Sequence, residues 1–564
     1  MLATETLAKI NPFPLRVFAP LRRGIFFAAR YTKPANLALG EIMQVQMHLQ
    51  KPEHNQLVGV PIHQTKKINR FYEAAGLEQQ GKLKEAEQVY IKLLDDHFGN
   101  VAVMAALGMN YAVQEKHGLA HGLLSYALNH VENLERDIAA LGVSIMEKEC
   151  GGKARFLKMK RSEIMNAIGT TWKHENKTAE ARYWFQRAKD VLGEPNADIE
   201  NNLATLYINE GKPEGALVHL NKAIEIDKNH AQARWNRSLA NLEMGNYEAG
   251  FAEYNWGKRA QVRLDREYAK HKIPEWDGSK GKRIIVYGEQ GIGDEIMFAS
   301  VLPDLIRDSE QVVFDCHKKL HRLFCSSFPT LDIYGTREDE QITWPIKPDG
   351  NPRYQFDAKI AIGDLPRFYR KDIRDFPGTP YIQPTTEAQL KWAQRLDEAF
   401  GRGNPKPVIG INWIGGHKKT RVEVRSLKLE QLLPILKQDA HFVSLQYTPC
   451  EEEIFEFEQK HGIKIHHWPE ACYNEHYDET GGLVANLDLV ITCCSSVVHL
   501  AGSMGIPAWV ATPSRPAWRY RLDLDYMPWY GETVTLFRQK PDTVSWGPVI
   551  SEISDALSEM LSAR

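Results

Sequence analysis

The stretch Ile491–Pro507, with the sequence ITCCSSVVHLAGSMGIP, decides the fold that we predict for this chain. A β-branched run at 489–492 predicts a buried parallel strand, and the residues after it predict a helix. Ser495 and Ser496 lie at the turn between them, where the free N–H groups and the dipole of a helix favour a phosphate. His499 follows Ser495 by one helical turn and lies on the same face. The alternative is an ordinary helix that Ser495 caps, with His499 on the surface.

Short apolar runs and helical segments alternate on both sides of this stretch. Such alternation predicts parallel sheets, and here it forms two Rossmann-like halves. Two halves of this kind imply a cleft between them, with ligands at the carboxyl ends of the strands. The predicted strands are 282–287, 311–314, 331–334 and 358–362 in the first half, and 407–413, 441–445, 463–465, 487–492 and 508–511 in the second, which closes with a helix at 550–561.

A repeat of about 34 residues begins near residue 65. Its small residues allow two helices to approach closely, and the pattern resembles the tetratricopeptide repeat (TPR). We count four or five repeats, because the stretch 130–160 fits poorly. Stacked repeats form a superhelix with a concave groove that commonly binds peptides; a scaffold or a dimer contact is the alternative. The small positions are occupied by Gly108, Ala120, Ala204, Ala216 and Ala223.

The chain therefore divides into five segments, and the first of them has no clear repeat. Near the N-terminus, arginines at 16, 22, 23 and 30 interleave with phenylalanines. This chemistry suits a membrane surface or a partner, but we expect the patch to pack on the neighbouring repeats. The predicted segments are 1–64 of unassigned structure, 65–257 with the repeats, a charged linker at 258–282, a first lobe at 283–400 and a second lobe at 401–564.

The composition narrows the classes of function. Of 564 residues, 43% are apolar and 25% are charged, as in soluble globular proteins. The net charge of −2 provides no general attraction to nucleic acid. The seven cysteines include no CxxC pair, which argues against a zinc site and favours a reducing compartment. Because no apolar run reaches the length of about 18 residues typical of a membrane span, we expect a cytoplasmic protein.

The turn Gly291-Ile292-Gly293-Asp294 follows the first predicted strand of the first half. Glycines at such a turn allow close approach of a ligand, and Asp294 can act there as a general base toward an acceptor hydroxyl. A nicotinamide dinucleotide fingerprint would need a third glycine, but Ile296 stands in its place. The alternative role for Asp294 is to cap the helix that follows.

The segment 413–427, WIGGHKKTRVEVRSL, places cations after the first strand of the second half. Lys418, Lys419 and Arg425 are the candidates for binding a nucleotide diphosphate, because cations neutralise the charge of such a leaving group. A solvated loop is the alternative. The coincidence of a Gly-Gly turn with the end of the strand favours the functional interpretation.

At this point the motifs match a known family. The chain resembles the bacterial TPR glycosyltransferases, whose catalytic half is similar to lipopolysaccharide heptosyltransferases and, more distantly, to O-linked N-acetylglucosamine transferase. This resemblance implies a TPR superhelix followed by an α/β GT-B fold, and transfer of a sugar from a nucleotide donor without an obligatory metal or other cofactor. It covers residues 275–564 and the repeats, and the segments that carry it are 287–305, 411–427, 442–447, 491–510, 515–522 and 527–539.

The resemblance also assigns roles to particular residues. Asp294 falls on the Gly-Asp pair whose carboxylate is the proposed base, and Arg425 falls near a lysine that contacts the donor phosphate. The segment with Ser495, Ser496 and His499 falls on the Asp-Thr-x-x-x-His motif that holds the donor.

One residue departs from the family pattern. Cys494 stands where the heptosyltransferases have aspartate, and a thiol accepts hydrogen bonds only weakly. The donor sugar is therefore not inherited from the resemblance. This departure also keeps open a binding scaffold with a degenerate catalytic half. Arg515, Trp518 and Arg519 are further possible contacts to the sugar or nucleotide.

Two motifs imitate metal sites. Asp523 and Asp525 have the spacing of a DxD metal motif, but they do not follow a strand, so we interpret them as a solvated or capping pair. His466 and His467 have no third ligand at a useful spacing. We therefore predict no metal site.

Together these features predict an inverting glycosyltransferase that uses a nucleotide sugar. The repeat groove would hold a protein acceptor, for instance a surface protein such as flagellin. A lipid-linked or polysaccharide acceptor is the alternative that would use the N-terminal patch at a membrane. The sequence leaves the sugar, the base and the oligomeric state open.

Overall fold

The structure is a computed structural model that describes residues 62–563. Stretches at 97–99, 141–146, 269–272, 340–341, 345–352 and 417–421, and positions 343, 474, 542 and 544, lie outside the described residues. Within helices, only the backbone is described at 62–68, at 96, at 137–140 and at 147–154. The predicted basic and aromatic patch near the N-terminus also lies outside the described residues.

The predicted repeats form antiparallel helical hairpins, of which the described chain holds five. Small residues make them possible: a Cβ on Gly108 would lie 2.7 Å from Leu124, and one on Gly169 would lie 2.6 Å from Phe185. The hairpins are α4 (Ile62–Gln79) with α5 (Leu83–Asp96), α6 (Val101–Val113) with α7 (His117–Ala140), α8 (Glu147–His174) with α9 (Thr178–Leu192), α10 (Ala197–Asn209) with α11 (Pro213–Ile226), and α12 (Ala231–Glu243) with α13 (Tyr247–Tyr254), followed by the short α14 (Trp256–Arg259).

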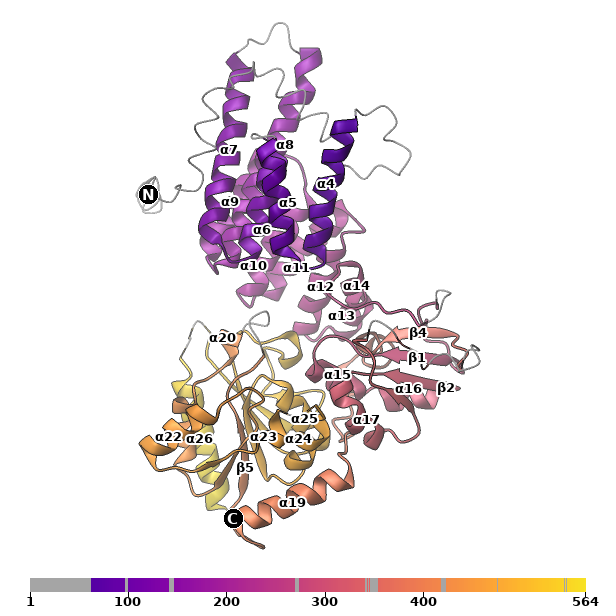
Figure 1. Cartoon of the computed structure of the whole chain (residues 1–564), viewed down its shortest axis with the longest axis vertical. Coiled ribbons are helices and arrows are strands. Elements are labelled where there is room, and N and C mark those ends of the chain that lie inside the picture. The colour runs from indigo at the N-terminus through magenta and orange to yellow at the C-terminus, as the bar shows by residue number, and fades with distance from the viewer. Residues whose placement is uncertain are drawn as a thin grey trace. The chain divides into compact units, whose positions relative to one another are not determined.

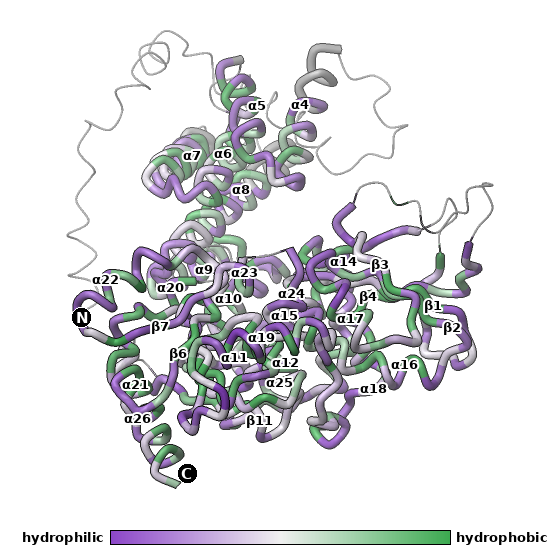
Figure 2. Tube along the Cα trace, turned by 60° about the horizontal axis from the view of Figure 1, so that its bottom comes forward, coloured by the Kyte–Doolittle hydropathy of each residue, from purple (hydrophilic) through white to green (hydrophobic). Residues whose placement is uncertain are grey.

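The middle of the repeat region departs from the period for a visible reason. Helices α7 and α8 contain 24 and 28 residues, about twice the length of α6, so the sequence between 130 and 160 has no place in a regular repeat. Hydrophobic and hydrophilic residues alternate along α7 (Figure 2), as expected for a helix that buries one face. The described helices include none that is both long and apolar enough to cross a membrane.

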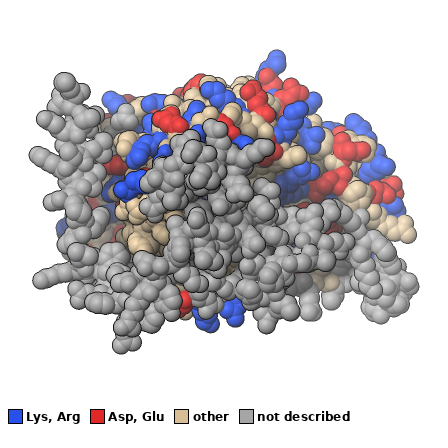
Figure 3. Space-filling view, turned by 90° about the horizontal axis from the view of Figure 1, so that it is seen from above, with Lys and Arg blue, Asp and Glu red and all other residues tan. Residues whose placement is uncertain are grey.

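The chain forms two compact units, Met1–Leu206 and Tyr207–Arg564. The boundary lies inside α10, not at the predicted end of the repeats near residue 257. The reason is packing, because Leu242, Phe251 and Tyr254 of the last hairpin belong to the same buried core as both α/β lobes. The last hairpin is therefore part of the second unit. On the face seen in Figure 3, acidic and basic side chains are mixed wherever the described residues are visible.

The first lobe is built on a four-stranded parallel sheet in the order β3-β2-β1-β4. Alternate residues of each strand face opposite sides: Ile284 and Val286 face the helices, whereas Ile285 and Tyr287 face Tyr268 and Trp344. Its strands are β1 (Arg283–Tyr287), β2 (Gln311–Asp315), β3 (Asp332–Tyr334) and β4 (Ala358–Ala361), and its helices include α15 (Ile292–Ala299), α16 (Leu302–Asp308), α17 (His321–Ser327) and α18 (Pro366–Tyr369).

Residues 260–268, which we call the strap, belong to the predicted linker but pack on this lobe. Arg263 is fully buried and donates to Glu289 at 2.8 Å and to Asp364 at 2.6 Å. The hydroxyl of Tyr268 donates to Asp315 at 2.6 Å. Two residues of the predicted linker, Arg263 and Tyr268, thus make buried contacts with the first lobe.

The second lobe contains a seven-stranded sheet in the order β10-β11-β9-β8-β5-β6-β7. All neighbouring strands are parallel except β10 and β11. The predicted strands of this half are confirmed, but the sequence analysis missed β10 and β11. Its strands are β5 (Val408–Asn412), β6 (His441–Ser444), β7 (Ile465–His466), β8 (Leu489–Cys493), β9 (Ala508–Thr512), β10 (Tyr526–Met527) and β11 (Gly531–Arg538).

Helices cover both faces of this sheet, as Figure 1 shows for α22 and α26 on one side and α24 and α25 on the other. Strand β8 divides its residues accordingly: Leu489 and Ile491 enter one core, and Val490 enters the other. The two Rossmann-like lobes after the helical repeats confirm the predicted fold class. The helices are α20 (Val422–Arg425), α21 (Leu433–Leu436), α22 (Glu451–His461), α23 (Pro469–Cys472), α24 (Tyr477–Val484), α25 (Ser496–Met504) and α26 (Gly547–Ser562).

Helix α19 (Thr386–Phe400) connects the lobes and packs on α24 of the second one. The indole of Trp392 donates to Glu479 at 2.9 Å. The two helices approach closely because a Cβ on Gly482 would lie 2.6 Å from the backbone of Ala388. The segment 386–400, which the sequence analysis placed with the first lobe, thus contacts the second.

We predict that Gly482→Ala lowers the free energy of unfolding by about 1–3 kcal/mol, because a methyl group placed against a rigid backbone forces the helices apart. Gly76→Ala in α4 is the control, since no atom lies within 4 Å of the added Cβ; it should leave stability unchanged or raise it by up to ~1 kcal/mol. Urea unfolding of both variants checks this. Equal stability of Gly482→Ala and the unchanged chain would contradict the close packing.

Candidate active site

The second sheet reverses its strand order between β5 and β8, which are neighbours although they are far apart in the chain. Ligands of open α/β sheets bind at such a point, outside the carboxyl ends of the strands. The loops after these two strands come very close, since a Cβ on Gly415 would lie 2.6 Å from the carbonyl oxygen of Cys494. The two segments singled out in the sequence, 413–427 and 491–507, thus meet at this edge.

The start of α25 has the predicted geometry. Ser495 has an extended backbone, and its side chain accepts a hydrogen bond from the N–H of Val497 at 3.3 Å. Ser496 accepts one from the hydroxyl of Tyr477 at 3.1 Å. The capping interpretation of Ser495 is therefore correct. Capping by one side chain leaves the dipole of the helix directed at the same place.

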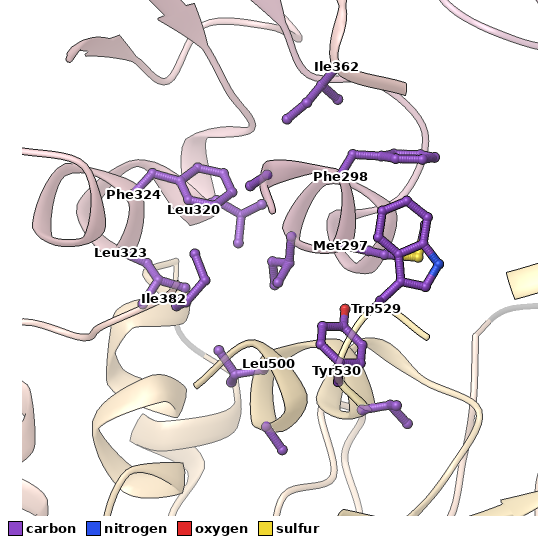
Figure 4. Close-up of a cluster of buried hydrophobic side chains, with 14 of the residues drawn as sticks. Met297, Phe298, Leu320, Leu323, Phe324, Ile362, Ile382, Leu500, Trp529 and Tyr530 are labelled. Atoms are coloured by element: carbon purple, nitrogen blue, oxygen red, sulfur yellow. The ribbon is translucent and has the colours of Figure 1, made fainter. Parts of the chain in front are cut away.

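Helix α15 of the first lobe packs directly on this helix start. A Cβ on Gly293 would lie 2.8 Å from the ring of His499 and 3.2 Å from Cα of Ser496, so only glycine permits the approach. Figure 4 shows the buried side chains beside this contact, with Met297 and Phe298 of α15 on one side and Leu500 of α25 on the other. The lobes thus meet here through packed side chains.

Asp294, the residue after Gly293, lies at the edge of this contact. Its carboxylate accepts a hydrogen bond from the N–H of Gly291 at 3.4 Å, as the capping alternative predicts. The other carboxylate oxygen forms an ion pair with Arg519 of the second lobe. Both side chains are largely buried, with 18% of Asp294 and 14% of Arg519 exposed. The predicted base thus bridges the two lobes.

Arg519 lies in the short helix η8 (Trp518–Tyr520). Burial alone would lower its pKa, but Asp294, together with the smaller effects of Tyr520, Tyr254 and Cys494, raises the pKa above the ordinary value. Its Nε atom is buried and has no hydrogen-bond partner among the described residues. The guanidinium thus keeps a donor unused while it pairs with Asp294.

His499 is buried, with 4% of its surface exposed, so its predicted place on the surface in the alternative interpretation is wrong. Its Nδ1 lies 2.9 Å from the hydroxyl of Tyr530. Burial, followed by the charges of Arg519 and Arg425, lowers its pKa well below the ordinary value. The imidazole is therefore neutral and supplies no positive charge to an anion.

Cys494 is also buried, with 2% exposed. Burial raises the pKa of its thiol to about 11, against the opposing effect of Arg425. Tyr520 and Thr512 also oppose the rise of this pKa. The thiol at this position is therefore protonated and buried.

Arg425, at the end of α20, lies on the same side. Its Nε donates to the carbonyl of Gly415 at 2.9 Å, and its charge acts on Cys494, His499 and Tyr520. Two arginines from separate loops thus converge on the start of α25. Lys418 and Lys419 lie outside the described residues.

The remaining candidates have other uses. Arg515 donates to the carbonyl of Asn209 in α10 and touches Gly211 in the following turn. Trp518 is 9% exposed and packs against Phe251 and Tyr254 with ring centroids 6.0 and 6.1 Å apart. The indole is therefore part of the core, and its role as a possible sugar contact stays a prediction.

The two motifs that resemble metal sites do not form one. Among the described residues, no group of three or more His, Cys, Asp or Glu side chains could hold a metal ion. Asp523 instead pairs with Arg521 at 2.7 Å, and His467 lies 3.0 Å from the hydroxyl of Tyr473. Sequence reasoning missed Tyr477, Tyr520 and Tyr530, which surround the start of α25. Two of them, Tyr520 and Tyr530, lie in segments that carry the family resemblance, and this was the one available signal. No local pattern indicates that a tyrosine side chain will lie beside α25, because folding brings these distant segments together.

A second acidic residue lies beneath the turn that carries Asp294. Glu295 is fully buried, accepts a hydrogen bond from the N–H of His317 at 2.8 Å and pairs with Arg337 at 3.1 Å. Arg337 also donates to the carbonyl of Gln290 at 3.0 Å. Burial raises the pKa of Glu295 to about 7, although Arg337 opposes the rise. This pair fixes the turn from below.

The chain was compared with protein families, with curated proteins and with solved structures. No protein-family model matches it. Protein FlbA of Caulobacter vibrioides is 26% identical over 454 residues, which cover 71% of this chain and 73% of that protein.

Solved structures that resemble the chain include E. coli ADP-heptose lipopolysaccharide heptosyltransferase II (12% identity, 50% of this chain and 98% of that chain, TM-score 0.33) and a family 9 glycosyl transferase from Veillonella parvula (13%, 50% and 90%, TM-score 0.33). The TPR protein YrrB is 20% identical, over 36% of this chain and 90% of that chain, with a TM-score of 0.20.

We predict that the stability of the unchanged chain relative to Glu295→Gln falls as the pH rises from about 5 to about 8. The folded pKa of about 7 exceeds the ordinary value of 4.5, so the folded state binds more protons in this range and loses stability as they dissociate. The slope is at most about 1.4 kcal/mol per pH unit.

Urea unfolding at several pH values checks this prediction. Glu532→Gln, at an exposed position of β11, controls for the change in net charge. A stability difference between the chain and Glu295→Gln that stays constant with pH would show that Glu295 does not titrate in this range.

Proposed function

We propose that this protein is an inverting, metal-independent glycosyltransferase that uses a nucleotide sugar. The observation that carries the proposal is the meeting of Asp294 of the first lobe with Arg519 and the start of α25 of the second lobe. A carboxylate on one lobe and a helix start with two arginines on the other are the two components that sugar transfer from a diphosphate requires. The resemblance of the motifs to heptosyltransferases supports the same assignment.

In the proposed reaction, Asp294 accepts the proton of an acceptor hydroxyl. The acceptor oxygen forms a bond to the anomeric carbon of the sugar, and the bond from that carbon to the diphosphate oxygen breaks on the opposite face. The leaving nucleoside diphosphate carries away the negative charge. Arg425 and the dipole of α25 stabilise this charge, with Lys418 and Lys419 as further cations.

In this proposal, the ion pair between Asp294 and Arg519 holds the base before the donor binds. While one carboxylate oxygen of Asp294 is paired with the guanidinium, that oxygen is occupied and is not available to an acceptor hydroxyl. Arg519 keeps its Nε free of hydrogen bonds in the described structure. A donor phosphate is a competing partner for this guanidinium. Binding of the donor would therefore release Asp294 for the acceptor.

The acceptor in this proposal is a protein segment held by the groove of the repeats, for instance from a surface protein such as flagellin. Stacked helical hairpins form concave surfaces of the kind that bind peptides. Intact-mass measurement of co-expressed candidate proteins tests this part. A sugar on a lipid-linked or polysaccharide acceptor, with no mass change on any protein, would contradict it.

A catalytically degenerate scaffold is the second candidate, and Cys494 in place of a carboxylate is the observation that favours it. Binding of ADP, GDP, CDP and UDP separates the two functions, because a ligand of the folded state raises the melting temperature. We expect a shift with at least one diphosphate. A panel without any shift would favour the scaffold.

We predict that Asp294→Asn lowers sugar transfer by roughly 10²- to 10⁴-fold, the range for loss of a general base, and leaves nucleotide binding nearly unchanged. The amide keeps the size of the side chain and can still accept the hydrogen bond from Gly291. Asp525→Asn is the matched control, because Asp525 is exposed and belongs to the imitated metal motif; it should transfer sugar at the full rate. Retained turnover in Asp294→Asn would remove Asp294 from the base role.

A further inference from the structure

The last hairpin, α12 and α13, contacts both segments of the proposed site. It belongs to the same compact unit as the two lobes. Its buried residues join those of α15 and of residues 518–530 in one continuous hydrophobic core. A repeat that only presented an acceptor groove would not need to enter this core.

On the side of the second lobe, the hairpin holds the loop that carries Arg519. Arg521 donates to the hydroxyl of Tyr247 at 3.0 Å and to the carbonyl of Met244 at 3.3 Å. Arg521 has a φ of 57°, a conformation that costs energy for a residue with a side chain. Contacts with the hairpin therefore fix a strained residue two positions from Arg519.

The guanidinium of Arg521 also gives the reason why position 245, in the turn between α12 and α13, is a glycine. A Cβ on Gly245 would lie 2.1 Å from this group, so the turn between α12 and α13 leaves room for it. Trp518, on the other side of Arg519, packs between Phe251 and Tyr254 of α13. Trp518, one position before Arg519, and Arg521, two positions after it, thus both contact the hairpin.

On the side of the first lobe, the hairpin and the strap hold the turn before Asp294. The amide of Gln290 donates to the hydroxyl of Tyr254 at 3.0 Å. Gln290 has a φ of 61°, so this turn also contains a strained residue. Arg263 of the strap contacts both Glu289, at 2.8 Å, and the carbonyl of Tyr254, at 2.6 Å.

We propose that the last hairpin is part of the catalytic unit, and that Tyr247 and Tyr254 are positioning residues for Arg519 and Asp294, respectively. The two hydroxyls lie on one short helix and reach opposite lobes. A rigid α13 therefore sets the place of the base relative to the arginine. This inference rests on the proposed function for its catalytic consequence, whereas the positioning itself is independent of the reaction.

The experiment uses Tyr247→Phe and Tyr254→Phe in the full chain, because each removes one hydroxyl and keeps the buried ring. Hydrogen–deuterium exchange of backbone amides is the first measurement. Tyr247→Phe should speed exchange in residues 515–521 and Tyr254→Phe in residues 288–294. Tyr354→Phe is the matched control, since it removes a hydroxyl that donates to Asp332 at 3.1 Å elsewhere in the first lobe; it should leave both segments unchanged.

Turnover and nucleotide affinity are the second measurements. Turnover should fall roughly tenfold in both variants, because small displacements of reacting groups cost one to two orders of magnitude. Affinity for ADP, GDP, CDP or UDP should fall only in Tyr247→Phe, whose loop lies on the donor side. This separation distinguishes positioning from general destabilisation, which would affect both measurements in both variants.

Two results would overturn the inference. Unchanged exchange in both segments would show that the hydroxyls do not hold them, and faster exchange with full turnover would show that the positioning does not matter to catalysis. Failure of the proposed function is seen separately, as a wild-type chain that binds no nucleotide and transfers no sugar. In that case the exchange data still decide whether the hairpin holds the two segments.

Discussion

The close approach of α15 to α25 is the contact on which the rest of the second unit depends. Gly293 permits it, since any larger residue would strike His499 and Ser496. Because the helices touch, the two lobes share one hydrophobic core, and Asp294 reaches Arg519 across the boundary between them. The approach thus brings an acidic residue of one Rossmann-like lobe next to basic residues of the other.

Buried charge is concentrated beneath this site. Arg263 with Glu289, and Arg337 with Glu295, both flank the turn that precedes Asp294. Buried ion pairs are expensive to desolvate, so they are poor sources of net stability. Our hypothesis is that they specify geometry here, because each pair also bonds to the backbone of a fixed neighbour. The strained conformation of Gln290 agrees with a turn that its surroundings hold in place.

Much of the site was predictable from local pattern. The strand and helix around Ser495 follow from a β-branched run and a capping residue, and Asp294 follows from a glycine turn after a strand. The partners of these residues were not predictable in the same way. Arg519 is 225 residues from Asp294 in the chain, and no local signal pairs them. The burial of His499 and Trp518 was not predictable for the same reason, since burial depends on elements that are distant in sequence.

The sequence by itself determined the order of the elements, the two parallel sheets and the repeat architecture, because hydrophobic periodicity and small residues act over short distances. Even so, β11 was missed, although Val534 and Leu536 alternate with polar residues there, since its pairing with β9 decides that it is a strand. Only the tertiary structure decided that the last hairpin belongs with the lobes and that Arg263 and Tyr268 of the predicted linker are buried. Both outcomes depend on which apolar surfaces are buried against one another. This is decided only when segments that are distant in the sequence pack together.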